Sequence, residues 1–289
     1  MNAICCINEL LPQFIDELSN RNMLNQTDSI TVNEKLAFSK GSLNILGSHT
    51  GKTNFSLSLV RELSINKNVP VGLFTCGENN KKQIVRRFIS QEARVNYSKI
   101  TNGHLQQQEK QRINDCMETI YKCPFLLNDE VLSFNKLKEY IKTMVLENNV
   151  QFIIVDDFYN LSDILDYAFF WECKTSYETN DNYRNAVAKL LNSIKNLAEK
   201  FNIPILLTMN ISPSFGEPTM RCFKELSSLI KEKSDMIIFL YKEKDYIEES
   251  AAVDYYIIIE KNNSGRKERT RYIYEVPYLR YDFASVLEN

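Results

Sequence analysis

The stretch "LGSHTGKTNF", residues 46–55, places the triplet Gly51-Lys52-Thr53 at the end of a short glycine-containing segment. This triplet closes the phosphate-binding pattern G-x-x-x-x-G-K-[ST], in which the lysine reaches the phosphates and the hydroxyl ligates Mg²⁺. The first glycine of the full pattern would fall at position 46, which is leucine, and Gly47 comes one position late. The sequence therefore predicts a shortened phosphate-binding loop.

The residues on both sides of the triplet have the order that such a loop needs. "SLNIL" (42–46) predicts a buried strand, and residues 52–66 predict a helix whose positive N-terminal end faces the loop. We expect residues 47–51 to form the loop and to bind ATP together with the first two residues of the helix. The predicted ATP-binding residues here are Gly47, Ser48, His49, Thr50, Gly51, Lys52 and Thr53.

Predicted strands alternate with predicted helices along the rest of the chain. The strands are predicted at 69–75, 124–129, 150–158, 203–210, 235–241, 254–261 and 270–276, and the helices at 79–94, 102–122, 134–148 and 183–201. This alternation predicts an α/β fold with a mainly parallel twisted sheet flanked by helices. The turn-like "NNSGRKER" (262–269) joins the last two predicted strands, so we expect antiparallel strands at the C-terminal end of the sheet.

The composition narrows the class of protein. The chain has 289 residues, of which 44% are hydrophobic and 25% charged, as in ordinary globular proteins. A net charge of −2 excludes a basic field over the whole chain.

No run approaches the roughly 18 apolar residues of a membrane span, and the first basic residue is Arg21, so no signal peptide is indicated. Seven scattered cysteines without a CxxC motif indicate reduced thiols, and we expect a cytoplasmic protein with no membrane partner.

Carboxylates follow two of the predicted strands. "FIIVDD" (152–157) ends in Asp156 and Asp157, and "VGLFTCGE" (71–78) ends in Glu78. Ligands bind beyond the carboxyl ends of strands in open α/β sheets. Asp156 is therefore a candidate for holding Mg²⁺ with Thr53, and Glu78 is a candidate base that orients and deprotonates an attacking water.

Several further stretches occur in a characteristic order. They are "LFTCGENNKKQIVRRFISQEARV" (73–95), "KITNGHL" (99–105), "FIIVDDFYNL" (152–161), "LAEKFNIPILLTMN" (197–210), "DMIIFLYKEKDY" (235–246) and "IIIEKNNSG" (257–265). With this series, residues 41–283 resemble the C-terminal, RecA-like ATPase domain of DnaB-type replicative DNA helicases, which are superfamily 4 helicases.

The resemblance implies a RecA-like P-loop NTPase domain over residues 41–289. The helical spacing of apolar residues in 8–23 predicts an amphipathic helix and linker over residues 1–40. The resemblance also implies a hexameric ring that hydrolyses ATP with Mg²⁺ between subunits and moves along single-stranded DNA. The roles carried over by position are Glu78 as catalytic base, Asp156 as the Walker B acid, Arg87 as a structural or ATP-binding arginine, Asn210 as the catalytic sensor, and Lys261 contacting the ATP of a neighbouring subunit.

The chain departs from the family at positions that matter for catalysis. The sensor glutamine is Asn210, and the arginine expected two places after Lys261 is Asn263, although Arg266 is close by. An arginine finger contributes roughly 10³–10⁵ in rate in related NTPases. Two functions stay open: a divergent ATP-hydrolysing helicase, or a RecA-fold ATP-binding assembly or regulatory module. A small-molecule kinase is less favoured. Such kinases usually close a lid with arginines over the phosphates, and residues 162–181 contain no arginine and only one lysine, Lys174.

Three segments are candidates for contacts with DNA or with other subunits. Residues 211–224 contain Arg221 and Lys224, which we predict to bind DNA. Residues 162–181 are rich in aromatic side chains, which either stack on bases or belong to the core or an interface. A helix predicted at 8–23 packs either on its own domain or on a neighbouring subunit.

Overall fold

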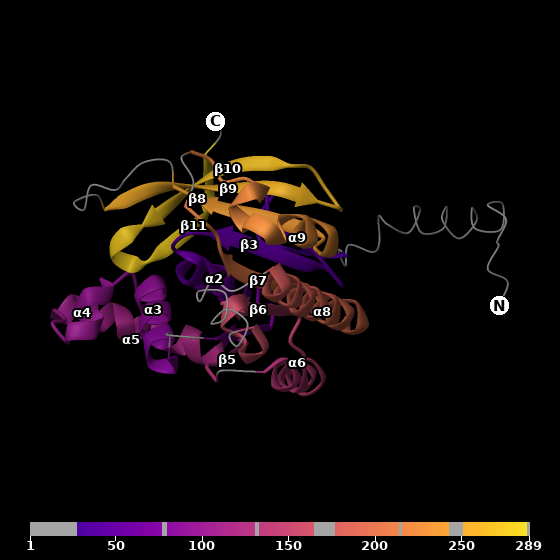
Figure 1. Cartoon of the computed structure of the whole chain (residues 1–289). Helices are drawn as coiled ribbons and strands as arrows, with labels where there is room; N and C mark the ends of the chain where they lie inside the picture. The colour runs from indigo at the N-terminus through magenta and orange to yellow at the C-terminus, as the bar shows by residue number, and fades with distance from the viewer. Residues whose placement is uncertain are drawn as a thin grey trace, which may run out of the picture.

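A nine-stranded sheet runs through the centre of the protein (Figure 1). The computed structural model describes residues 28–76, 80–130, 133–164, 177–213, 216–242 and 251–287. Across the sheet the strands follow the order β11-β10-β9-β8-β3-β7-β6-β4-β5.

The strands and helices have the following bounds. The sheet contains β3 (Leu43–Ser48), β4 (Val71–Thr75), β5 (Phe125–Asn128), β6 (Phe152–Asp156), β7 (Ile205–Asn210), β8 (Met236–Tyr241), β9 (Ala252–Asn262), β10 (Glu268–Glu275) and β11 (Arg280–Leu287). The α-helices of the described residues are α2 (Lys52–Arg61), which continues as the π-helical turn η1 (Glu62–Asn66), then α3 (Lys81–Ala93), α4 (Tyr97–Asn102), α5 (Gln107–Lys122), α6 (Phe134–Asn148), α8 (Tyr177–Phe201) and α9 (Ser227–Lys233). Short 3₁₀ turns are η2 (Phe158–Asn160), η3 (Met220–Leu226) and η4 (Val276–Tyr278).

The expected fold class is confirmed. Strands β3 to β8 pair in parallel, and β9, β10 and β11 complete the sheet in antiparallel pairs. The sequence predicted the pair β9–β10 but not β11, in which the polar residues Arg280 and Asp282 interrupt the apolar run. Helix α8 also begins at Tyr177, six residues before its predicted start.

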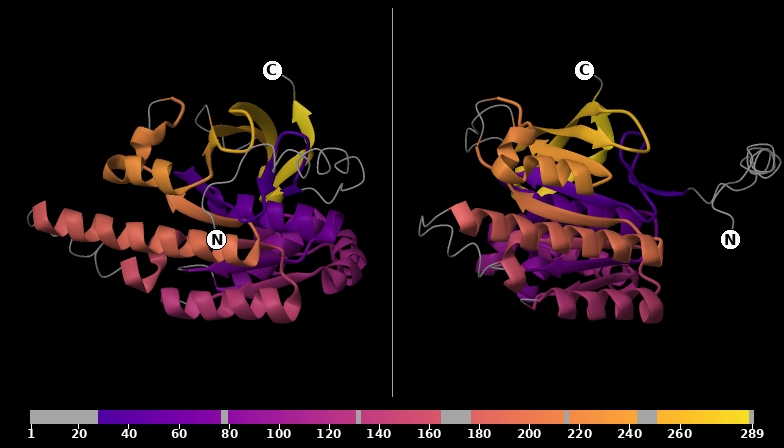
Figure 2. Two further views of the ribbon diagram at one scale, coloured as in Figure 1. Left: turned by 90° about the vertical axis from the view of Figure 1, so that its right-hand side faces the viewer. Right: turned by 45° about the vertical axis from the view of Figure 1, so that its right-hand side comes forward.

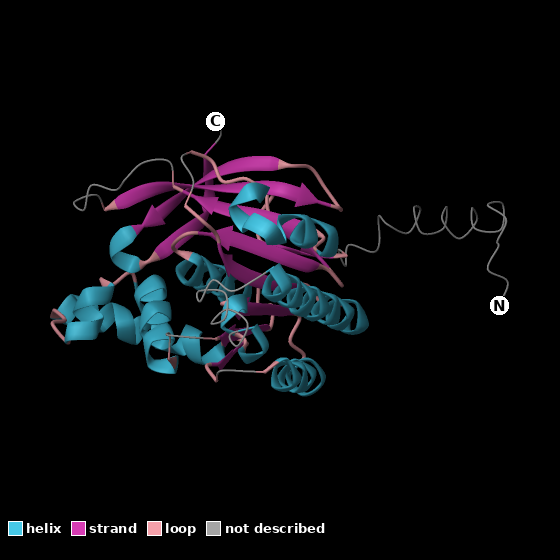
Figure 3. Cartoon of the chain, viewed as in Figure 1, coloured by secondary structure: helices cyan, strands magenta, loops and turns pink. Residues whose placement is uncertain are grey.

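Both faces of the sheet are covered, because alternate side chains of each strand point to opposite faces. In β3, Leu43 and Ile45 enter a core shared with α6, α8 and α9, whereas Leu46 enters a second core shared with α2 and α3. Figure 3 shows the strands as one continuous sheet between helical layers. Helices α6 and α8 lie side by side in the two views of Figure 2. This burial on both faces explains the nearly continuous apolar sequence of the strands.

A small two-stranded sheet precedes the main one. Strands β1 (Ser29–Thr31) and β2 (Ala37–Ser39) pair in antiparallel fashion. The side chain of Phe38 is fully buried, and its ring centroid lies 5.0 Å from that of Phe152 in β6. Packing against the main sheet therefore begins before residue 41, where we expected the domain to start.

Glycine and asparagine residues end several helices in the left-handed conformation that stops a helix. Gly103 (φ 74°) separates α4, which the sequence did not predict, from α5, which begins five residues after the predicted start at 102, and Asn149 (φ 55°) ends α6. Within the part of the chain that the structure describes, no helix is long and apolar enough to cross a membrane.

Candidate functional site

The predicted phosphate-binding loop lies between β3 and α2. It consists of residues 49–51, and α2 begins directly at Lys52. Gly51 has a φ of 84°, and a Cβ atom at this position would lie 2.9 Å from the hydroxyl oxygen of the buried Tyr281. Glycine is required here for both reasons. The first turn of α2 contains no acidic residue, so its N-terminal N–H groups offer a positive end to an anion.

The loop is shorter than predicted because Gly47 and Ser48 belong to β3. A Cβ atom on Gly47 would lie 2.8 Å from Cζ of Phe223 and 3.1 Å from Cδ1 of Phe239, so packing alone explains this glycine. The hydroxyl of Ser48 is 2.7 Å from the carbonyl oxygen of Thr50 and 3.0 Å from that of Leu240. Contacts of Gly47, Ser48, His49 and Thr50 with ATP stay a prediction.

The structure brings the hydroxyl of Thr53 to the carboxylate of Asp156. Thr53 Oγ1 donates to Asp156 Oδ2 at 2.6 Å, and Thr208 Oγ1 in β7 donates to the other oxygen, Oδ1, at 2.5 Å. Asp156 is buried, and these two hydroxyls fix the orientation of its carboxylate. The two residues predicted to hold Mg²⁺ therefore lie together at the carboxyl edge of the sheet.

A second group of polar side chains lies beside this pair. The ammonium of Lys52 donates to Asn210 Oδ1, and Asn210 Nδ2 donates to Asp157 Oδ2 at 2.6 Å. Lys52 Nζ lies 3.9 Å from Asp157 Oδ2, and the two side chains are 10% and 13% exposed. Burial raises the pKa of Asp157 to about 6, although the nearby Lys52 opposes the shift. The catalytic candidate Asn210 thus contacts the predicted phosphate-binding lysine directly.

Arg87 lies behind the loop. Its Nη1 donates to Asn54 Oδ1 at 2.8 Å, and its guanidinium carbon lies 5.6 Å from the centroid of the Tyr97 ring. Asn54 follows Thr53 in α2, so Arg87 connects α3 and α4 to the helix that carries the loop. Its role in ATP binding stays a prediction.

Lys261 lies away from the phosphate-binding loop of its own chain. It pairs with Ile237 near the start of β8. Strand β8 runs parallel to β3, and the loop follows the end of β3, so Lys261 lies toward the opposite edge of the sheet. Its Nζ donates to the carbonyl oxygens of Lys231, at 2.7 Å, and Ser234, at 2.5 Å, near the end of α9. Partial burial lowers the pKa of Lys261. Contact with a neighbouring subunit's ATP stays a prediction and would require Lys261 to leave these carbonyls.

Asn263, at the position where the resemblance predicted an arginine, is bound within its own chain. Its Nδ2 donates to Asp235 Oδ1 at 3.2 Å, and its backbone N–H donates to the carbonyl oxygen of Asp235 at 3.0 Å. Lys195 also donates to Asp235 Oδ1, at 3.1 Å. These contacts hold the start of the β9–β10 turn against β8.

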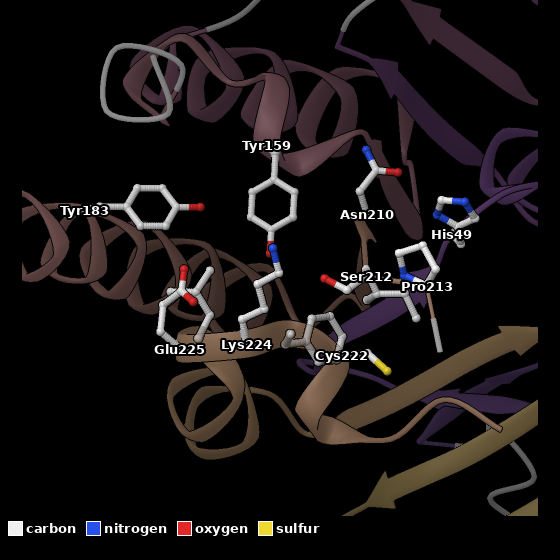
Figure 4. Close-up of a pocket in the computed structure, with 12 residues that line it drawn as sticks. His49, Tyr159, Tyr183, Asn210, Ser212, Pro213, Cys222, Lys224 and Glu225 are labelled. Atoms are coloured by element: carbon white, nitrogen blue, oxygen red, sulfur yellow. The ribbon is translucent and has the colours of Figure 1, made fainter. Parts of the chain in front are cut away.

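The predicted DNA-binding residues lie in η3, and both are exposed. A pocket of about 440 Å³ extends from the loop residue His49 and the β7 residue Asn210 to this turn (Figure 4). Lys224 lines the pocket, and Tyr159 and Tyr183 form the opposite side. The pocket connects η3 with the predicted phosphate site. DNA binding by Arg221 and Lys224 stays a prediction.

Several predicted features lie outside the described residues. These are Glu78, the helix expected at 8–23, residues 165–176 of the aromatic segment, and residues 214–215 of the second predicted DNA segment. Thr208 was not among the predicted site residues. The signal available for it was a single hydroxyl within the apolar run "ILLTMN", which requires a buried partner.

Two replicative DNA helicases are similar to this chain in sequence. The probable replicative DNA helicase of Trieres chinensis is 24% identical over 202 residues, which cover 68% of this chain and 42% of that protein. The replicative DNA helicase DnaB of Pasteurella multocida is 25% identical over 241 residues, which cover 80% of this chain and 49% of that protein. The chain therefore spans less than half the length of these two relatives.

The fold has a counterpart among solved structures. One solved ATPase domain superposes with a TM-score of 0.74 at 18% identity, over 96% of this chain and 98% of that one. Residues 26–283 match the model of the DnaB-like helicase C terminal domain, and the chain therefore belongs to this family.

Proposed function

We propose that this chain is the ATP-hydrolysing motor of a DnaB-like DNA helicase that acts on single-stranded DNA as a ring of subunits. The observation that carries the proposal is the 2.6 Å contact between the Thr53 hydroxyl and the Asp156 carboxylate, next to Lys52 at the start of α2. In P-loop NTPases a hydroxyl and a carboxylate in these positions hold Mg²⁺. Family membership supports the same reading.

The residues at this edge fit Mg²⁺ bound together with ATP. Mg²⁺ prefers oxygen ligands and is commonly held by one or two protein side chains plus substrate phosphates and water. Thr53 and Asp156 offer two such oxygens, and Thr208 keeps the carboxylate oriented. The bound ion would neutralise charge on the β- and γ-phosphates. Lys52 would leave Asn210 and contact the phosphates, and the predicted base Glu78 would accept a proton from the attacking water.

Hydrolysis would depend on assembly. A transition state with growing negative charge needs cations from outside the phosphate loop. We expect Lys261 of a neighbouring subunit to supply one, and Asn263 to supply none because an amide carries no charge. The expected result is slow basal turnover that increases when subunits associate. Single-stranded DNA would contact Arg221 and Lys224, and the pocket beside Asn210 would connect that contact to the ATP site.

Lys52→Ala provides the direct test. We expect it to abolish binding of Mg-ATP in titration calorimetry, because the lysine is the charged group at the start of α2. Lys67→Ala, at an exposed lysine where the same helical segment ends, is the matched control and should bind as wild type does. ATPase rates of the wild type with and without single-stranded DNA then separate a motor from a module that binds ATP without using it.

Two outcomes would contradict the proposal. Absence of ATP binding by the wild type at millimolar concentration would mean that the loop is no longer functional. Tight ATP binding with turnover at background, unchanged by DNA, would instead favour the assembly or regulatory module.

A further inference from the structure

Asp157 accepts hydrogen bonds on both of its carboxylate oxygens. Oδ1 accepts from the backbone N–H of Tyr159 at 3.2 Å, and Oδ2 accepts from Asn210 Nδ2 at 2.6 Å. The proposed mechanism gives no role to Asp157, which follows the predicted Mg²⁺ ligand Asp156. Its contact with Asn210 nevertheless determines how that side chain faces the ATP site.

The charges on both sides of Asn210 fix the orientation of its amide. The oxygen Oδ1 accepts from the ammonium of Lys52, and Nδ2 donates to the carboxylate of Asp157. The reversed amide would place its NH₂ group against an ammonium, which only donates, and its oxygen against a carboxylate, which only accepts. Both contacts would become repulsive. The oxygen of Asn210 therefore faces Lys52, and the NH₂ group faces away.

This orientation limits what Asn210 can bind in the ATP site. The terminal phosphate oxygens of ATP are acceptors, so they cannot form a hydrogen bond with an amide oxygen. Groups that carry hydrogen can do so, and next to the γ-phosphate these are the ammonium of Lys52 and a water molecule. A sensor that donated to the γ-phosphate would need the amide NH₂, and Asp157 already accepts one of its two N–H groups.

We propose that Asp157 is a positioning residue that holds the Asn210 amide with its oxygen toward the water that attacks the γ-phosphate. The inference rests on the proposed ATP hydrolysis and deepens it. In that step the water oxygen bonds to the γ-phosphorus, and the bond from the γ-phosphorus to the bridging oxygen breaks. The electron pair leaves with ADP, and a water proton passes to the base. Asn210 accepts a hydrogen bond throughout and takes no proton.

An exchange of the two side chains tests this arrangement. Asp157→Asn supplies one acceptor oxygen where two are needed, so the new amide cannot satisfy both Tyr159 N–H and Asn210 Nδ2. Asn210→Asp places two carboxylates in contact. In the double variant D157N/N210D, the amide at position 157 accepts from Tyr159 N–H and donates to the carboxylate at position 210. That carboxylate still turns an oxygen toward Lys52.

Each single variant should lower kcat for ATP about tenfold or more, with KM changed by less than about threefold. Each should also lower the melting temperature of the nucleotide-free protein by about 2–4 °C. The double variant should recover most of both losses. Asp115→Asn is the matched control, because Asp115 accepts from the amide of Gln111 at 2.7 Å on the exposed helix α5, away from the site. It should leave turnover unchanged.

The outcomes separate this inference from the proposed function. Wild-type turnover in Asp157→Asn, or a double variant no better than its single parents, would overturn the inference while leaving hydrolysis intact. If the wild type itself lacks turnover, the proposed function fails. The melting temperatures then still test the pair, and additive losses would show that the two side chains do not interact.

Discussion

Gly47→Ala tests whether this glycine serves phosphate binding or packing. The sequence places Gly47 near the start of the phosphate loop, whereas the structure places it in β3 beneath two aromatic rings. An added Cβ atom would lie 2.8 Å from Phe223, 3.0 Å from Ile211 and 3.1 Å from Phe239. The two rings pack against each other with centroids 5.5 Å apart, so neither can move without disturbing the other.

The size of the effect follows from these contacts. Adding atoms to a well-packed core costs about 1–3 kcal/mol, and we expect about 2–3 kcal/mol here because the contacted groups are rings. Replacing glycine by alanine also stabilises by about 0.4–1 kcal/mol, because it restricts the unfolded chain. The net loss is about 1–2.5 kcal/mol, which corresponds to a fall in melting temperature of roughly 2–10 °C for a domain of this size.

Thermal unfolding of the nucleotide-free protein measures this loss. Gly72→Ala, in the buried strand β4, is the matched control, since its nearest atoms are the flexible side-chain ends Ile153 Cδ1 and Met144 Sδ, both at 2.8 Å. It should cost less than Gly47→Ala. Adding Phe223→Leu to Gly47→Ala should recover part of the loss, because leucine lacks the nearest ring atom. The double variant should therefore be more stable than the sum of the single losses predicts.

The reasoning would be refuted by a Gly47→Ala protein with wild-type melting temperature and ATP affinity weakened tenfold or more. That result would place the backbone of Gly47 against the phosphates. A loss of stability with unchanged affinity would assign this glycine to packing and leave the phosphates to residues 49–53.

Further predictions concern the metal ligands, the sheet edge and assembly. Thr208→Val removes the hydroxyl that donates to Oδ1 of the buried Asp156 and should lower the free energy of unfolding by about 1–3 kcal/mol in urea titrations; an unchanged midpoint would show that this contact contributes nothing. Lys261→Met keeps the aliphatic stem but loses two carbonyl contacts at the end of α9, so we expect a loss of about 1–3 kcal/mol by the same assay, and wild-type stability would argue against these contacts. Deleting residues 1–27 spares β1 and should lower the oligomer mass in light scattering if this segment docks on a neighbouring subunit; an unchanged mass would favour packing within the chain.

Local patterns in the sequence predicted the α/β architecture. The alternation of apolar runs with helical periodicity depends on neighbouring residues, and β4, β6, β7 and β8 all form within their predicted stretches. The triplet at 51–53 and the acid at 156 could be assigned to one edge for the same reason. The triplet follows β3 and Asp156 ends β6, and the carboxyl ends of parallel strands share one side of a sheet.

The tertiary structure decided which polar groups meet at that edge. Thr53, Asp156 and Thr208 are far apart in the chain, and the adjacency of β3, β7 and β6 in the sheet brings them into contact. The same adjacency places Asn210 between Lys52 and Asp157. Whether a glycine lies under an aromatic ring, or a lysine on the end of a helix, depends on packing between distant elements. Sequence by itself determined the elements and their order, because these arise from local periodicity, whereas the contacts that orient the side chains arise only when the sheet assembles.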